Sequence, residues 1–89
     1  MKLVPFKQGV ATALGLCARG AEGEVKLLTF KKDRSVAVRA REDSVCLEEE
    51  GFEDALLVLE AGPAAKRAAR EAIGREFPRS NKVYLSPNA

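Results

Sequence analysis

SVAVRAR, residues 35–41, is the most regularly alternating stretch of the chain, and it decides the fold class. Val36 and Val38 fall on one side of an extended strand. Arg39 and Arg41 fall on the opposite side. This period of two is typical of a strand that has one face in a core and the other in water. The stretch therefore predicts a strand in an antiparallel sheet.

The segments on either side of this strand also have the composition of strands. Residues 25–31 and residues 45–48 are rich in Val and Leu. Short polar turns at residues 32–34 and 42–43 separate these segments from the strand at residues 35–41. Strands joined by such short connections usually pair with their neighbours. We therefore predict an antiparallel meander over residues 25–48.

Two segments outside the meander have the composition of helices. In residues 9–19, apolar residues recur at helical spacing and no charge precedes the last position, which predicts a largely buried helix. In residues 63–77, alanines gather on one side and arginines lie on the other. Pro63 suits the first helical position and Pro78 ends the helix. The small alanine side chains would let this second helix lie close to a sheet.

Short strands are predicted near both ends of the chain. Residues 2–6 form the first, and Pro5 indicates that this strand lies at a sheet edge. Residues 82–85 form the last. A further strand at residues 55–60 precedes the second helix. The order of elements is therefore β-α-β-β-β-β-α-β. We predict a single α+β domain over residues 1–89, a two-layer sandwich with two helices on one face of a mostly antiparallel sheet.

The run Ala55-Leu56-Leu57-Val58-Leu59 is continuously apolar over the length of one strand. Strands of this composition usually lie in the middle of a sheet with both faces covered. We therefore expect Leu57 and Leu59 to be among the most buried side chains. The acidic residues 48–50, which precede this run, are expected to form a solvated loop.

The chain lacks the residues that most catalytic and metal sites require. Histidine is absent, which excludes histidine general bases, Cys-His and Ser-His pairs, and zinc sites that need imidazole. Cys17 and Cys46 form no CxxC motif and are expected to be reduced, mostly buried thiols. We expect no catalytic residue, no metal site, no cofactor and no enzymatic activity.

The sequence shows no segment that would direct the chain into a membrane. No stretch approaches the roughly 18 apolar residues that a transmembrane helix needs. Residues 10–18 only loosely resemble a secretory signal, and a buried helix explains them better. We expect a cytoplasmic protein without a membrane partner.

Charge is unevenly distributed along the chain, although the net charge is only +2. Residues 42–54 contain seven acidic residues and no basic one, which leaves the remainder strongly basic. A basic face could bind phosphates or nucleic acid. The alternative is an ordinary solvated surface that neighbouring carboxylates partly neutralise. The candidate residues are Lys31, Lys32, Arg34, Arg39 and Arg41 on the hairpin, and Lys66, Arg67 and Arg70 on the second helix.

Two functions therefore remain open. The first is a small non-catalytic binding or regulatory module for an anionic partner such as nucleic acid. The second is a structural or adaptor subunit that contacts another protein, or a second copy of itself, through a sheet edge or the acidic segment. A continuous positive face would favour the first function. Charges of both signs together with an apolar patch would favour the second.

Overall fold

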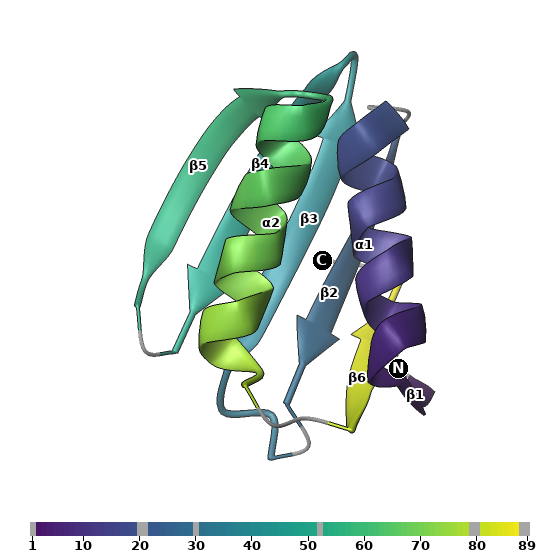
Figure 1. The fold of residues 1–89 in the computed structure, drawn as a ribbon, viewed down its shortest axis with the longest axis vertical. Helices are drawn as coiled ribbons and strands as arrows, with labels where there is room; N and C mark the ends of the chain where they lie inside the picture. Colours follow the sequence, from purple (N-terminus) through teal and green to yellow (C-terminus); the bar gives the residue numbers. More distant parts are fainter. Residues whose placement is uncertain (1, 20–21, 30, 52, 79–80, 88–89) are drawn as a thin grey trace.

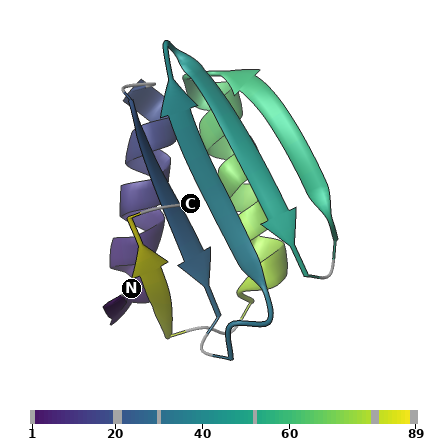
Figure 2. The same cartoon turned by 180° about the vertical axis from the view of Figure 1, so that it is seen from behind.

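The computed structural model describes residues 2–19, 22–29, 31–51, 53–78 and 81–87. Figures 1 and 2 show two layers: a six-stranded antiparallel sheet, and two helices that cover one of its faces. The α+β class and the order of elements are confirmed. The elements are β1 (Lys2–Pro5), α1 (Phe6–Arg19), β2 (Gly23–Leu28), β3 (Ser35–Arg41), β4 (Ser44–Glu50), β5 (Ala55–Glu60), α2 (Pro63–Glu76) and β6 (Lys82–Ser86).

The strands follow the spatial order β1-β6-β2-β3-β4-β5. The meander is confirmed, and β3 lies inside it, where Val38 pairs with Val25 of β2 and Leu47 of β4. The β3–β4 connection is a two-residue turn. Glu42 and Asp43 have φ angles of 51° and 63°, the left-handed values that tight hairpins require. The first and last strands pair with each other, so β1 lies at the edge that Pro5 indicated.

The core lies between the helices and the sheet. Leu27, Val38 and Val45 project from the sheet toward the helices and are fully buried. Helix α1 approaches the sheet closely at Gly9, where a Cβ atom would lie 2.8 Å from Cγ2 of Val83. Alanines of α2 fill the corresponding positions of the second helix. The predicted close packing of an alanine-rich helix face on the sheet is therefore confirmed.

Helix α1 differs from its prediction in two respects. It begins at Phe6 rather than at residue 9. Its inner side is buried at Ala13 and Cys17, whereas Ala11 and Thr12 are exposed, so the helix is not buried all round. The physical reason is its position: α1 lies over β2 and β6 with α2 on one side only (Figure 1). Neither helix of the described chain is long and apolar enough to span a bilayer.

Strand β5 lies at the edge of the sheet, so its predicted central position is wrong. The exposed fractions are 63% for Leu56, 45% for Leu57 and 67% for Val58, and Leu59 is only half-buried. Figure 1 shows the reason, because α2 lies over the inner strands and β5 lies outside it. No further strand of the described sheet follows β5. Neither face of this apolar strand is therefore fully covered.

The predicted acidic loop at residues 48–50 is wrong as well, because these residues continue β4. The alternation that buries Leu47 also turns Glu49 toward the helices, where it is 3% exposed. The guanidinium of Arg75 in α2 forms a bidentate ion pair with the carboxylate of Glu49 and so compensates for the cost of burying that charge. Its Nη2 lies 2.7 Å from Oε1 of Glu49, and its Nε lies 3.1 Å from Oε2. An ion pair therefore fastens α2 to β4, and donation to the carboxylate raises the pKa of Arg75.

Candidate functional site

The free edge of β5 presents a row of backbone hydrogen-bonding groups. The N–H of Ala61 donates to the carbonyl of Asp43, over 2.8 Å, just beyond the end of the β4–β5 ladder. In an antiparallel pair, every second residue exchanges such bonds with the neighbouring strand. The odd-numbered residues of β5 therefore bond to β4. The N–H and C=O groups of Leu56, Val58 and Glu60 point toward the open edge.

The side chains along this edge are apolar in the middle and acidic at the ends. Leu56 and Val58 project from the face of the sheet without helices, and Leu57 projects from the helix face. Three adjacent large apolar side chains are thus exposed on one edge strand, two on one face of the sheet and one on the other. Asp54 and Glu60 flank them. We call the backbone edge and side chains of residues 56–60 the β5 edge.

The opposite edge of the sheet is built differently. Strand β1 has four residues, including Lys2 and Pro5, and short length, lysine and proline all hinder the addition of another strand. Strand β5 contains neither a proline nor a basic residue, and its pairing with β4 runs without a bulge from Ala55 to Glu60. The β5 edge therefore lacks the short length, the lysine and the proline that protect the β1 edge.

The basic residues predicted on the hairpin lie in two separate places. Lys31, Lys32 and Arg34 belong to the connection between β2 and β3, and the ammonium of Lys32 lies 4.6 Å from the ring centre of Tyr84. The second group, Arg39 and Arg41 of β3, projects from the face of the sheet without helices. These two residues lie toward the other end of the strand.

Carboxylates surround Arg39. Its Nη1 lies 3.4 Å from Oε1 of Glu48, and its Nε lies 3.9 Å from Oε2 of Glu24. Glu24, Arg39 and Glu48 come from three neighbouring strands and therefore alternate in sign across the sheet. This part of the sheet face has mixed charge rather than a continuous positive potential.

The basic residues of α2 do lie together. Lys66, Arg67 and Arg70 surround a shallow hollow of about 230 Å³ beside Pro63, near the start of the helix. None of the described residues that line this hollow is acidic. Because α2 covers the opposite face of the sheet from Arg39, the structure does not unite the helix group with the β3 group. The eight candidate residues thus form three groups.

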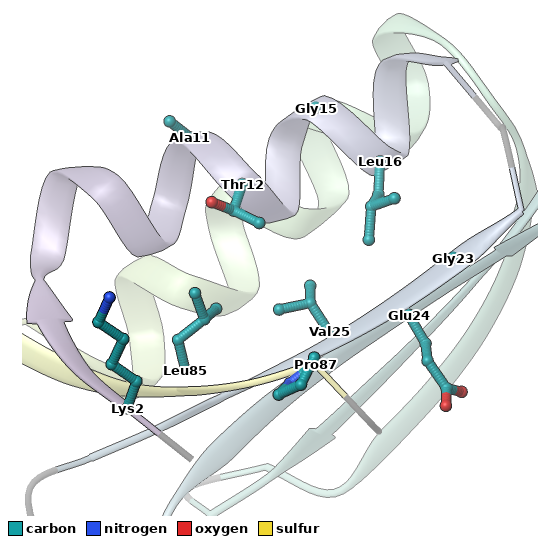
Figure 3. Close-up of a pocket in the computed structure, with 10 residues that line it drawn as sticks. All are labelled: Lys2, Ala11, Thr12, Gly15, Leu16, Gly23, Glu24, Val25, Leu85 and Pro87. Carbon is teal, nitrogen blue, oxygen red and sulfur yellow. The ribbon is translucent and has the colours of Figure 1, made fainter.

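A larger, mostly apolar hollow of about 690 Å³ lies between α1 and the sheet. In Figure 3, Leu16 points from the helix toward β2 near Gly23 and Val25, while Lys2 and Glu24 lie at opposite ends. The described residues that line it include no nucleophile paired with a base. Ala11, Thr12, Gly15, Gly23 and Pro87 complete its lining.

The two cysteines lie in different environments. Cys17 is completely buried, and burial raises the pKa of its thiol to about 11, so the thiol is protonated at neutral pH. Cys46 is half-buried on β4, opposite Val58. Both thiols are free. In the part of the chain that the structure describes, no group of acidic or cysteine side chains could hold a metal ion.

No protein-family model, curated protein or solved structure matches this chain. Its function is therefore inferred from the geometry and chemistry of its own surface. The sequence prediction did not include Leu56 and Val58, the most exposed large apolar side chains among the residues that the structure describes. A signal was present in the acidic residues that flank the run, because a strand that ends in carboxylates keeps its ends in water.

Proposed function

We propose that the protein is a cytoplasmic, non-catalytic structural or adaptor subunit that acts through protein–protein contact at the β5 edge. The supporting observation is the exposure of Leu56 and Val58 along a strand whose backbone groups face outward. Such an edge is a template for another strand, because main-chain bonds supply affinity and the side-chain pockets supply specificity.

The distribution of charge also favours this function over binding to a broad anionic surface. Arg39 lies between Glu24 and Glu48, and Arg75 pairs with Glu49, so two prominent cations are occupied by carboxylates. An apolar patch lies beside these mixed charges. This combination is the one expected of a protein-binding subunit.

Replacing Val58 with proline should abolish partner binding while preserving the fold. Proline removes the outward N–H at this position, and edge strands tolerate proline where the N–H faces solvent. The measurement is quantitative mass spectrometry of material purified with the tagged chain from the cells that make it. A partner present in near-equal amount with the parent should fall at least about 10-fold with Val58→Pro, as expected for a lost central contact.

Leu3→Lys is the matched control, because Leu3 is an exposed apolar residue on the opposite edge, at 38%. This variant should retain the partner. Equal recovery of every partner with the parent and with Val58→Pro would contradict a role for the β5 edge.

A second function, binding of an anionic partner such as nucleic acid, is favoured by one observation. Lys66, Arg67 and Arg70 line one hollow beside the positive end of the α2 dipole, and no acidic residue is among the described residues of its lining. Three phosphate contacts of this kind would give a logarithmic salt slope of about −3 on duplex DNA.

Changing Lys66 and Arg70 to glutamate should remove this binding for all sequences alike, since phosphate contacts carry no sequence information. The measurement is a fluorescence titration against a mixed-sequence duplex at low salt, repeated at several salt concentrations. Arg39→Glu is the control and should have a smaller effect, because Arg39 already has carboxylate partners. Absence of binding near 100 μM, where non-specific binders usually register, would contradict this function.

A further inference from the structure

The hollow between α1 and the sheet lies where β6 ends and β2 continues. Strand β6 pairs with β2 only along residues 26–28, so no described strand lies beside residues 23–25 of β2 on that side. Helix α1 extends over this part of β2 (Figure 3). The space of about 690 Å³ beneath the helix is therefore open at the side of the sheet.

The hollow has a physical cause in the sequence of α1. The helix meets the sheet closely at Gly9, where a Cβ atom would lie 2.8 Å from Val83. It meets the sheet again through Leu16, whose Cδ2 would lie 3.0 Å from a Cβ atom built at Gly23. Between these two places, α1 contributes three small residues to the lining: Ala11, Thr12 and Gly15. The helix therefore spans the hollow without filling it.

The large side chains of the lining are apolar. Val25 and Leu85 point from the strands toward α1, and Leu16 points from the helix toward the sheet (Figure 3). Binding sites for small molecules are usually lined by apolar groups and have volumes of about 300–1,000 Å³. The hollow thus has the size and the lining of a site for a small organic molecule.

The two charged residues of the lining face opposite sides of the sheet. Lys2 is the cross-strand partner of Leu85, and such partners share a face, so Lys2 lies on the helix side. Figure 3 shows its ammonium directed toward α1. Glu24 precedes the buried Val25 and therefore projects from the other face, where it lies 3.9 Å from Arg39. Among the described lining residues, the charge that faces the hollow is positive.

We propose that this hollow binds a small apolar carboxylate of the class of medium-chain fatty acids. The ion pairs of the described residues are formed by Arg39 and Arg75, and none of them includes Lys2. The Lys2 ammonium would donate hydrogen bonds to the ligand carboxylate. The hydrocarbon chain would displace water from the apolar lining. The site is on the side of the sheet opposite the β5 edge, so this inference goes beyond the proposed function and does not depend on it.

The charges of the lining disfavour other small amphiphiles. An apolar amine would bring its ammonium beside that of Lys2, because the carboxylate of Glu24 is directed away from the hollow (Figure 3). An uncharged alcohol would bury the same hydrocarbon but would gain no ion pair with Lys2. The structure therefore predicts an order of affinity, with the carboxylate bound more tightly than the alcohol and the alcohol more tightly than the amine.

The first test is a titration of the full chain with octanoate, octanol and octylamine, followed by backbone amide NMR. Octanoate should bind with a dissociation constant on the order of 0.1 mM, at least about 5-fold more tightly than octanol. Each methylene added from hexanoate to octanoate should tighten binding about 2- to 4-fold, as expected for partly to fully buried methylenes. The shifted amides should include those of Thr12, Gly15 and Gly23.

The second test reverses the charge at the end of the hollow. Lys2→Glu should weaken octanoate binding at least about 10-fold and tighten octylamine binding, because an attraction becomes a repulsion and the reverse. Lys82→Glu is the matched control. It makes the same change in net charge at an exposed position of β6 that does not line the hollow, and it should leave both affinities within about 2-fold of the parent.

The third test fills the hollow. Thr12 is exposed and points from α1 toward the sheet in Figure 3, and its hydroxyl donates only to the carbonyl of Gln8 in the same helix. Thr12→Phe should weaken octanoate binding at least about 10-fold, since the ring takes the place of the hydrocarbon chain. Ala18→Phe, at an exposed position of α1 outside the lining, should bind as the parent does. Circular dichroism and thermal unfolding verify that both variants are folded.

The outcomes decide the inference separately from the β5 edge. Saturable octanoate binding that Lys2→Glu and Thr12→Phe weaken, and that their controls retain, supports it. No saturable binding up to about 10 mM overturns the site. Binding of octylamine as tight as that of octanoate overturns the assignment to carboxylates, and binding that Thr12→Phe does not weaken shows that the ligand uses another surface and overturns the site. The proposed function is tested by Val58→Pro, a change outside this lining.

Discussion

Replacing Leu27 with alanine should lower the free energy of unfolding by about 3–5 kcal/mol. Leu27 is completely buried on the helix face of β2, and its Cδ2 atom would lie 3.2 Å from a Cβ built at Gly9 of α1. The close approach of the helix leaves the surrounding backbone little room to collapse into the cavity. A loss of this size is a large fraction of the roughly 5–15 kcal/mol that stabilises a typical domain.

Leu57→Ala is the matched control, since it removes the same atoms from a position that is 45% exposed. We expect this change to cost about 1 kcal/mol or less, because a side chain that stays largely in contact with water gains little free energy from burial on folding. Urea unfolding measures both values. Equal losses at the two positions would contradict the edge position of β5.

Replacing Arg75 with alanine should lower the free energy of unfolding by about 2 kcal/mol. Removal of one partner of a fully buried ion pair costs about 3–5 kcal/mol, because the other charge loses its compensation. Here the side chain of Glu49 is 4% exposed, but that of Arg75 is 40% exposed, so solvent screens part of the loss. Glu53, 3.5 Å from the guanidinium, would also lose its cation.

The control for this prediction removes both charges. The double variant Glu49→Leu with Arg75→Leu should unfold within about 1 kcal/mol of the parent, because neither partner of the ion pair is left buried without the other. Thermal or urea unfolding at pH 7 measures both variants. A single variant as stable as the parent would show that water reaches Glu49 in the folded protein.

The sequence was sufficient to predict the fold class and the order of the elements along the chain, because local rules and the global arrangement agree there. The alternation of residues 35–41 puts Val36 and Val38 in the core, and the two-residue turn after this strand sets the hairpin. Proline at the start of α2 and alanines along its inner side predicted that helix correctly. Strand ends were less well predicted: β2 ends at Leu28, and residue 30 of the predicted strand lies outside the described residues.

Two features could not be predicted from local pattern. A short apolar run has the same composition in the middle of a sheet and at its edge, so the exposure of Leu57 depends on where the helices lie. Likewise, the burial of Glu49 depends on Arg75, which is 26 residues away. Both features arise from contacts between elements, and a local sequence pattern does not indicate which elements lie close together.

The candidate basic residues show the same limitation from another direction. The sequence identified the cations correctly but could not assign them to faces. Arg39 belongs to the sheet and Arg70 to the helix layer. The carboxylates that pair with Arg39 come from the two neighbouring strands. The groups that define the β5 edge, the outward N–H and C=O of Leu56 and Val58, are backbone atoms common to all non-proline residues, and only the sheet order exposes them.

The pairing of β1 with β6 has a consequence for how the chain is made. In the described sheet, β1 has β6 as its neighbour, and β6 in turn lies between β1 and β2. During synthesis, residues 2–5 therefore have no strand to join until residues 82–86 have left the ribosome. Until then, β2 also has an open edge beside it, at the same time as β5. The nascent chain thus has two apolar strand edges exposed together, and only the completion of its last strand closes one of them.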